Sequence, residues 1–388
     1  MSAWPEAAGV LEIVFWISVA LILYPYVLYP LAVLILGCIR PRPVRIGPRQ
    51  PMISILIPAY NEAECIATTV RNKLEQNYPG EKLQIIVVSD GSTDDTDEIV
   101  NRFADRGVQL LRREGREGKA AALNEAVRHA RGEIVVFSDA NSLFEKDAIR
   151  LMAENFADGE VGYVTGALGF EAQGSSLSGG GGAYMRYENL LRRAETRLGS
   201  IIGVNGGVDA IRRDLYTDIP HQLITDFVLP LTVIAGGHRV VFDARVKSRE
   251  AANTELSSEF RMRVRVALRA LQGLVFMRRL LNPLRYPVES FCLVSHKVMR
   301  YLGFVFLLLA LACNIGLAAS EPFYRLLLGI QVAGYALALI GLSSKLPRWL
   351  HRVAVVPSYV VMSYAAFAMA LFKFLKGDTM ATWRPRAG

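Results

Sequence analysis

The chain has 388 residues, a length that suits one sizeable domain with appended segments. Hydrophobic residues make up 52% of it and the mean hydropathy is +0.26, which is high for a soluble protein. The net charge is +8 and the excess basic residues lie beside apolar runs, so anionic lipids suit as partners and nucleic acid does not. The four cysteines lack metal-ligand spacing, which argues against a zinc site and predicts reduced structural thiols.

An apolar run opens the chain, and from residue 10 to residue 39 only Glu12 carries a charge. A bilayer core takes about 20 apolar residues, so residues 1–40 are predicted to be an N-terminal transmembrane segment, bent at Pro25 or Pro30. The run is too long for a signal peptide and has no basic start or small-residue cleavage site. Arginines follow it directly, which predicts that the next domain is cytosolic.

Residues 52–250 are predicted to form an α/β domain. Its strand-like runs are residues 53–59, 83–90, 108–113 and 133–139. Helical patterns separate these runs, and this alternation is typical of a mostly parallel sheet with crossover helices. The runs are apolar throughout, as strands buried on both faces should be.

The glycine-rich stretch at residues 174–182 has two interpretations, a flexible surface loop or a mobile lid near an acceptor site. A helical pattern follows at residues 183–199. Residues 204–214 predict a turn followed by an amphipathic piece.

Basic amphipathic helices are predicted within residues 258–290, because Arg261, Arg265 and Arg269 are four residues apart and oppose an apolar stripe. Such a helix beside membrane spans lies in the headgroup plane, although an ordinary solvated helix is the alternative. Three C-terminal transmembrane segments are predicted within residues 298–375.

A short tail, residues 376–388, follows the predicted spans. Strict alternation of the spans places the basic residues of this tail outside, against the positive-inside tendency. One of the three C-terminal segments could therefore be interfacial or re-entrant, and the sequence leaves both arrangements open.

Acids and amides follow three of the strand-like runs, within residues 58–62, 89–95 and 138–141. Ligands of open α/β sheets bind beyond the carboxyl ends of the strands. The chain has no GxGxxG after its first strand and no P-loop, which argues against a dinucleotide cofactor. The pattern suits a nucleotide held by side chains, with its diphosphate on a metal.

The motifs ILIPAYNE, VVSDGSTDDT, GKAAALNEA, SDAN and ITDF occur in this order. Together they resemble the family 2 glycosyltransferases, and more narrowly the membrane-bound branch similar to cellulose, hyaluronan and poly-N-acetylglucosamine synthases. The resemblance covers roughly residues 52–281. It implies a GT-A (Rossmann-like) catalytic domain that faces the cytosol from a bacterial inner membrane.

The resemblance also implies roles for single residues. Ala59, Tyr60 and Glu62 would line the uracil and ribose pocket, and Asp90 would accept a hydrogen bond from the uracil N–H. Lys119 would approach the base or the diphosphate. The alternatives are core packing for Tyr60, a turn residue for Asp90 and a solvated helix start for Lys119.

Asp139 would bind a Mg²⁺ or Mn²⁺ ion that bridges the diphosphate, since such cations prefer oxygen ligands. Asn141 replaces the second acid of the usual Asp-x-Asp motif and would be a weaker, neutral ligand. Asp226 would be the catalytic base that takes the proton of the acceptor hydroxyl, and its alternative is an ordinary acid at a helix start.

The Gln-x-x-Arg-Trp motif of the processive synthases is missing, and Arg265, Arg269 and Gln272 are the nearest candidates for holding the diphosphate. Trp383 would cap the site. The expected activity is inverting transfer from a UDP-sugar to a saccharide or lipid-linked acceptor, for envelope polysaccharide or glycolipid synthesis. Processive or single transfer and the oligomeric state stay open, and a non-catalytic nucleotide-binding scaffold is the rival.

Overall fold

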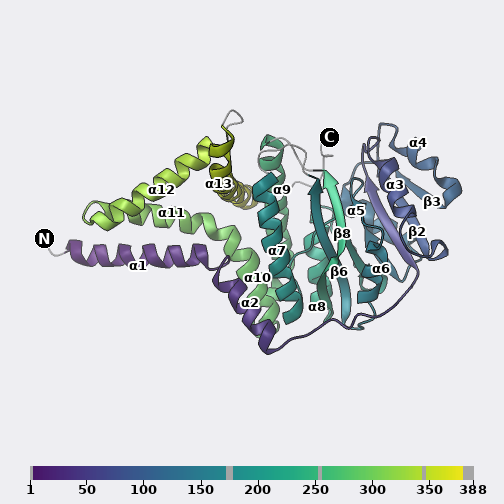
Figure 1. The fold of residues 1–388 in the computed structure, drawn as a ribbon, viewed down its shortest axis with the longest axis horizontal. Coiled ribbons are helices and arrows are strands. Elements are labelled where there is room, and N and C mark those ends of the chain that lie inside the picture. The colour runs from purple at the N-terminus through teal and green to yellow at the C-terminus, as the bar shows by residue number, and fades with distance from the viewer. Residues whose placement is uncertain (1–2, 172–177, 252–255, 343–346, 379–388) are drawn as a thin grey trace.

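The computed structural model describes residues 3–171, 178–251, 256–342 and 347–378. An α/β domain built on an eight-stranded sheet stands beside a set of long helices that project away from it (Figure 1). The strand order is β3-β2-β1-β4-β7-β6-β8-β5. The expected α/β architecture with additional apolar helices is therefore confirmed.

The first half of the sheet is parallel, as the sequence predicts. Its strands are β1 (Ile53–Ala59), β2 (Leu83–Asp90), β3 (Val108–Arg113) and β4 (Ile134–Phe137). Strand β1 lies between β2 and β4, and all seven of its residues are buried. The crossover helices are α3 (Ile66–Leu74), α4 (Thr96–Asn101) and α5 (Lys119–His129). This arrangement brings the carboxyl ends of β1, β2 and β4 to one edge of the sheet.

Two hydrophobic cores lie on opposite faces of this sheet. On one face, Ile55 and its alternate neighbours in β1 pack under α3 and α4, together with α6 (Ala148–Asn155). On the other face, Leu56 packs with α5 and with α8 (Thr225–Ala235). Successive side chains of a strand point to opposite faces, so an unbroken apolar run fills both cores.

The second half of the sheet is mixed. It contains β5 (Leu143–Phe144), β6 (Val161–Glu171), β7 (Asp209–Arg212) and β8 (Arg239–Ala251). Strand β7 is antiparallel to β4 and β6, β8 is parallel to β6, and β5 is antiparallel to β8. The amphipathic piece expected after residue 204 is thus β7, followed by a 3-10 turn. The other 3-10 helices are Gly80–Lys82, Ala104–Arg106 and Arg278–Leu281.

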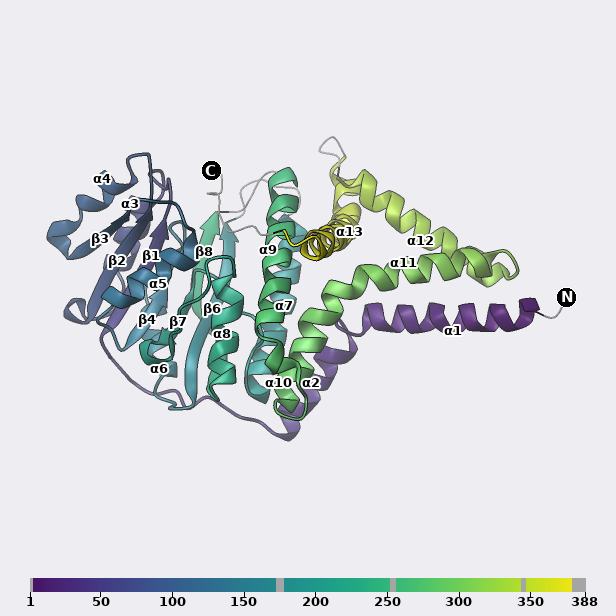
Figure 2. The same cartoon turned by 180° about the vertical axis from the view of Figure 1, so that it is seen from behind.

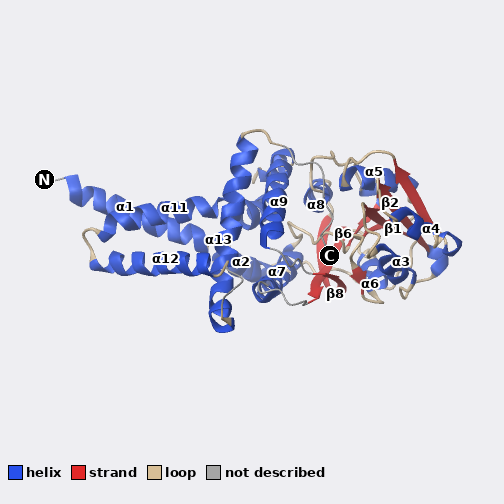
Figure 3. Ribbon diagram, turned by 90° about the horizontal axis from the view of Figure 1, so that it is seen from above, coloured by secondary structure: helices blue, strands red, loops and turns tan. Residues whose placement is uncertain are grey.

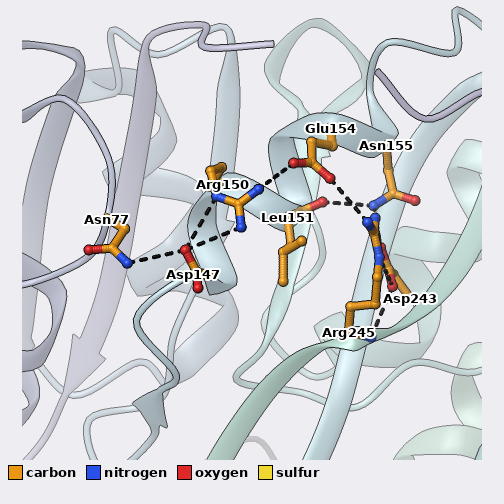
Figure 4. Close-up of polar contacts among 8 residues, drawn as sticks. All are labelled: Asn77, Asp147, Arg150, Leu151, Glu154, Asn155, Asp243 and Arg245. Atoms are coloured by element: carbon orange, nitrogen blue, oxygen red, sulfur yellow. Dashed lines mark hydrogen bonds and ion pairs between the residues drawn. The ribbon is translucent and has the colours of Figure 1, made fainter. Parts of the chain in front are cut away.

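A polar network fastens α6 to the middle of β8 (Figure 4). Asn155 donates to the Asp243 carboxylate at 2.8 Å, and Arg245 donates to the same group at 2.7 Å. Burial opposes ionisation of Asp243, but the hydrogen bonds from Arg245 and Asn155 outweigh it and lower its pKa. The network lies beside the irregular register of β6 and β8, where it replaces part of the regular pairing.

The glycine-rich stretch is only partly a loop. Residues 178–182 are helical and open α7 (Ser178–Leu198), so the prediction of loose backbone is wrong for them. Residues 174–177 lie outside the described part of the chain. A helix that continues into packed residues can hold glycines at its start, because tertiary contacts further along override their low propensity.

Helix α9 (Leu256–Phe276) carries the predicted basic amphipathic pattern. Its apolar side packs against α13 (Arg348–Leu375), with Leu268 and Ala366 fully buried at the contact. Of its arginines, Arg261 is exposed and Arg269 is buried. The basic side of α9 therefore faces the α/β domain at Arg269 and solvent at Arg261.

The remaining helices lie beside α7 or project away from the α/β domain. They are α1 (Ala3–Leu23), α2 (Leu28–Ile39), α10 (Pro287–Leu293), a π-helix (Val294–Val298), α11 (Met299–Ala318) and α12 (Pro322–Ile340). Helices α2 and α10 are the ones that stand alongside α7 (Figure 1). Within the described part of the chain, three helices, one of them α13, are long and apolar enough to cross a membrane. The number is four if the pair α1 and α2, bent by 53°, forms one span. The bend includes Pro25, one of the two predicted positions.

Helix α13 runs across the others. Helices α1, α11 and α12 project together to one side (Figure 3), whereas α13 is seen nearly end-on beside them (Figures 1 and 2). At its end, the Asp378 carbonyl accepts a hydrogen bond from Gln272 of α9 at 3.2 Å. The end of α13 thus lies on the side of the α/β domain, which fits the interfacial alternative. Trp383 lies outside the described residues.

Candidate active site

Three side chains from separate segments meet beyond the carboxyl ends of the strands. Lys119 donates to Asp139 at 2.7 Å and lies 3.5 Å from Asp226. Lys119 opens α5, Asp139 follows β4, and Asp226 lies in the first turn of α8. The fold therefore brings Lys119 and Asp139, which are 20 positions apart, together with Asp226, which is 107 positions from Lys119.

Lys119 is the electrostatic centre of this group. Burial alone would lower its pKa, but the charges of Asp139 and Asp226 outweigh burial and raise it. The ammonium group is thus firmly protonated between two carboxylates. All three side chains stay between 19% and 33% exposed, so a ligand can reach them. A diphosphate and a metal ion could exchange partners with this group without opening the core.

The donor set fits a hard divalent cation. Asp139 supplies a carboxylate and Asn141, half-buried two residues later, supplies an amide oxygen. Among the described residues no cluster of three His, Cys, Asp or Glu side chains is arranged to hold a metal. Mg²⁺ and Mn²⁺ sites commonly complete their shell with water and substrate phosphates, so two protein ligands are compatible with binding.

Two glycines bring a loop against the acids. A Cβ on Gly206 would collide with Asp226, and a Cβ on Gly207 would lie 3.1 Å from Asp139 Oδ2. Gly207 also has a φ of +86°, which a residue with a side chain rarely adopts. The backbone of this loop therefore forms the floor of the site, where no side chain has room.

Asp90 lies nearby, but its carboxylate is used by the chain itself. It accepts hydrogen bonds from the backbone N–H of Gly118 at 2.7 Å and Glu117 at 3.2 Å, and from Arg113 at 3.1 Å. The side chain is 1% exposed. Asp90 thus shapes the turn before Lys119. Among the described residues, Oδ2 accepts only the bond from Gly118, so one acceptor position of the carboxylate is left for a nucleobase N–H.

Tyr60 lies beside an arginine that the motif comparison missed. The Arg116 guanidinium stacks over the Tyr60 ring, 3.8 Å from its centre. Its Nε and Nη2 atoms are buried and have no hydrogen-bond partner among the described residues. The sequence signal that could have found Arg116 is its position as a basic residue in the turn just before α5. A flat cation on an aromatic ring with free donors suits a nucleotide ligand.

The other residues predicted for the base pocket lie at the same edge. Ala59 ends β1 fully buried, so only its backbone can face a ligand. The backbone N–H of Glu62 donates to Thr96 at 2.8 Å, and Cys65 donates to the Glu62 carboxylate at 3.1 Å. These bonds join the loops that follow β1 and β2 into one wall.

The three candidates on α9 are placed differently. Arg269 donates to the backbone carbonyls of residues 221–223, just before α8, and burial beside Arg265 lowers its pKa to about 10. Gln272 donates to Asp378 instead. Arg265 lies half-buried one turn before Arg269. In this structure Arg269 holds the segment that carries Asp226, and Arg269 and Gln272 do not join the acids around Lys119.

A buried acid, Asp209 at the start of β7, escaped the sequence analysis. It accepts hydrogen bonds from the Tyr163 hydroxyl and the Val208 backbone N–H. Burial and the charge of Asp226 raise its pKa well above the ordinary value. No motif marked it, because it lies inside a strand too short to be recognised.

A second group that the motifs did not mark supports the loop after β4, which carries Asp139 and Asn141. Lys73, fully buried in α3, donates to the Ser142 carbonyl at 2.6 Å. The Ser142 hydroxyl donates to Glu250 of β8. Burial lowers the pKa of Lys73 well below its ordinary value. These contacts fix the loop that carries Asp139 and Asn141 from two different elements.

Comparison with known proteins places the fold. A mannosyltransferase from Pyrobaculum calidifontis, solved with GDP-Man and Mn²⁺, superposes with a TM-score of 0.71 at 25% identity. The superposition covers 94% of this chain and 99% of that one. The α/β domain therefore has the GT-A-like fold of glycosyltransferases, as the resemblance implied.

Sequence comparison identifies the domain more narrowly. Residues 54–218 match the model of glycosyl transferase family 2, so the chain carries a domain of that family. Poly-beta-1,6-N-acetyl-D-glucosamine synthase of Staphylococcus aureus is 29% identical over 201 residues, which are 49% of this chain and 48% of that protein. The synthase of Staphylococcus epidermidis is 31% identical over 172 residues, which are 43% of this chain and 41% of that protein. The chain thus spans no more than about half the length of these curated relatives.

Proposed function

We propose that the protein is a membrane-integral, inverting glycosyltransferase that uses a nucleotide sugar and a divalent metal. The observation that carries the proposal is Lys119, held between Asp139 and Asp226 at the carboxyl edge of the sheet. The similar mannosyltransferase, solved with GDP-Man and Mn²⁺, supports a nucleotide-sugar donor and a metal. The synthases that match this chain support a saccharide product.

Asp226 acts as the general base in this proposal. Its carboxylate takes the proton of an acceptor hydroxyl while that oxygen bonds to the anomeric carbon of the donor. The bond from the anomeric carbon to the diphosphate breaks, and the nucleoside diphosphate leaves. A single displacement inverts the anomeric centre. Asp139 and Asn141 would hold a divalent ion, which would supply positive charge to the leaving group.

The chain's own cations hold the donor. Lys119 exchanges its bond to Asp139 for the diphosphate, and its position between two acids limits its motion. Arg116 and Tyr60 contact the nucleotide, because the guanidinium keeps two unpartnered nitrogen atoms beside the ring. We propose a UDP-sugar as the donor. The catalytic domain faces the cytosol of a bacterial inner membrane, and the acceptor is a saccharide or a lipid-linked sugar.

The test is nucleotide release by the full chain purified in nonionic detergent. UDP-N-acetylglucosamine, UDP-glucose and GDP-mannose are offered with Mg²⁺, with Mn²⁺ and with EDTA. We expect release of UDP from one UDP-sugar, only with a metal present. Release of GDP alone would overturn the choice of nucleotide. Tight binding of a donor without any turnover would favour the non-catalytic scaffold.

A further inference from the structure

A second charged cluster lies away from the candidate active site, between α7 and the π-helix. His296 bonds to Glu195 through Nδ1 at 2.6 Å and to Glu188 through Nε2 at 3.2 Å. Tyr24, at the break between α1 and α2, bonds to Ser295 at 2.8 Å. The cluster therefore lies where the chain passes from α2 and α10, which stand beside α7, to the projecting helices α1 and α11 (Figure 2).

The cluster gathers buried ionisable side chains. Its basic residues are Arg192, Lys297 and Arg300, and its acids are Glu188 and Glu195. Burial opposes ionisation of both acids, but His296 offsets it and lowers both pKa values, and Arg300 adds to this for Glu188. Both acids are thus ionised, and the two arginines balance their charge. Lys297 lies beside this balanced set, and a bound anion would give its ammonium a counter-charge.

The cations also leave hydrogen-bond donors unused. Arg300 is 6% exposed and donates through Nη1 to Glu188 and to Tyr184, but its Nε and Nη2 have no partner among the described residues. Arg192, 7% exposed, donates to Asn205 at 2.7 Å and leaves Nε without a described partner. Buried donors are nearly always satisfied in native proteins, so these atoms point to a missing acceptor.

A loop connects this cluster to the acids of the candidate active site. The Lys297 ammonium would lie 2.7 Å from a Cβ on Gly203, whereas a Cβ on Gly206 would collide with Asp226. Three residues of extended chain span at most about 11 Å. Lys297 and the proposed base thus lie at the two ends of a short loop. One or two sugar units would bridge a separation of this size.

The surroundings suit a ligand that enters from the membrane. Residues 287–318, which contain the π-helix, form one of the candidate spans, and ionisable residues within spans are generally functional. The rings of Tyr26 and Tyr187 lie 5.1 Å and 5.8 Å from the Arg300 guanidinium. Tyrosines with one polar end are typical of membrane interfaces.

We propose that Arg192, Lys297 and Arg300 bind the phosphate group of a lipid-linked acceptor, whose sugar then reaches Asp226 along the loop from Gly203 to Gly206. The inference rests on the proposed function, because it names the acceptor of that same reaction. A phosphate supplies acceptor oxygens for the unpartnered nitrogen atoms of Arg192 and Arg300 and a counter-charge for Lys297. The hydrocarbon tail stays beside the projecting helices.

Lys297→Ala is the most informative variant, because the Lys297 ammonium donates no hydrogen bond to any described residue and its loss should spare the fold. The full chain in nonionic detergent is titrated with dodecyl phosphate, dodecanol and inorganic phosphate, with thermal midpoint and calorimetric Kd as readouts. We expect dodecyl phosphate alone to stabilise the parent strongly. Its Kd should rise at least about tenfold in Lys297→Ala. Lys297→Arg should keep most of the affinity.

Arg285→Ala is the matched control, because Arg285 is exposed just before α10 and its loss changes the net charge equally. It should bind dodecyl phosphate like the parent. Equal Kd values for the parent and Lys297→Ala would overturn the proposal. Equal shifts with dodecanol would make the site one for apolar chains, and equal shifts with inorganic phosphate would make it one for free anions. None of these readouts needs turnover, so they separate failure of this proposal from failure of the proposed glycosyl transfer.

Discussion

Two carboxylate pairs in this protein each enclose one nitrogen-bearing side chain, but only one pair is open. Lys119 lies between Asp139 and Asp226, with all three side chains at least 19% exposed. His296 lies between two glutamates, with none of the three above 4%. The open pair can exchange its partners for a ligand at small cost. The sealed pair cannot, because any lost partner leaves a buried charge.

The difference in exposure predicts different roles for the two regions. At the sheet edge, the charges suit a donor and a metal that come and go. Where α7 meets the π-helix, the acids are fixed parts of the frame, and the unpartnered nitrogen atoms of Arg192 and Arg300, with the Lys297 ammonium beside them, remain for a ligand. Variants at the open pair should therefore change turnover, whereas variants at the sealed pair should change stability.

The largest expected effect is on turnover. Asp226→Asn removes the proposed base, and general-base catalysis contributes about 10²- to 10⁴-fold. Nucleotide release should fall by that factor while donor binding stays near the parent's. Asp218→Asn is the control, since Asp218 is exposed and pairs only with exposed Arg128 among the described residues. Parent-like turnover of Asp226→Asn would remove Asp226 from the mechanism.

The next effect is on stability. Glu188→Gln leaves Arg300 and His296 facing a neutral amide in a sealed site, and breaking a buried ion pair costs roughly 3–5 kcal/mol. The thermal midpoint in detergent should fall clearly. Glu145→Gln, at an exposed pair with Lys247, should stay within about 0.5 kcal/mol of the parent. Equal midpoints for both variants would show that the sealed cluster is not part of the frame.

A smaller effect is expected for the metal. Asn141→Asp restores the second acid of the Asp-x-Asp motif and adds a charged oxygen ligand. Half-maximal nucleotide release should need less Mg²⁺ or Mn²⁺, with maximal turnover within about tenfold of the parent. Titration of metal against release measures this. A loss of more than tenfold with unchanged metal demand would mean that Asn141 does not ligate the metal.

The smallest effect is a change in pH dependence. Burial and the charge of Asp226 raise the pKa of Asp209 in the folded protein. As the pH rises, the Asp209 carboxyl therefore stays protonated to a higher pH in the folded state than in the unfolded state. The parent should therefore lose stability as the pH rises from 3.8, the ordinary value, towards the raised pKa. Asp209→Asn lacks this proton, so its midpoint should fall less between pH 5 and pH 8. Parallel curves for the two proteins would refute the raised pKa.

Strands β1 to β4 and helices α3 to α5 were predictable because their signals are local. The apolar run at residues 53–59 is short and rich in isoleucine, which favours a buried strand, and the polar residues after it mark the ligand edge. The short strand β7 and the role of Lys73 carry no such signal. Lysines in helices usually lie at the surface, so the sequence does not indicate that Lys73 is buried. The packing of α3 against β5 buries it.

The sequence by itself determined the class of fold, the apolar helices and the acids expected at the strand ends, because periodicity and composition are properties of neighbouring residues. Tertiary structure decided which distant groups meet. It placed Lys119 between Asp139 and Asp226, turned Arg269 towards the backbone before α8, and enclosed His296 between two glutamates. These pairings depend on where whole elements pack, and the energy of a charge depends on burial, which no short stretch of sequence specifies.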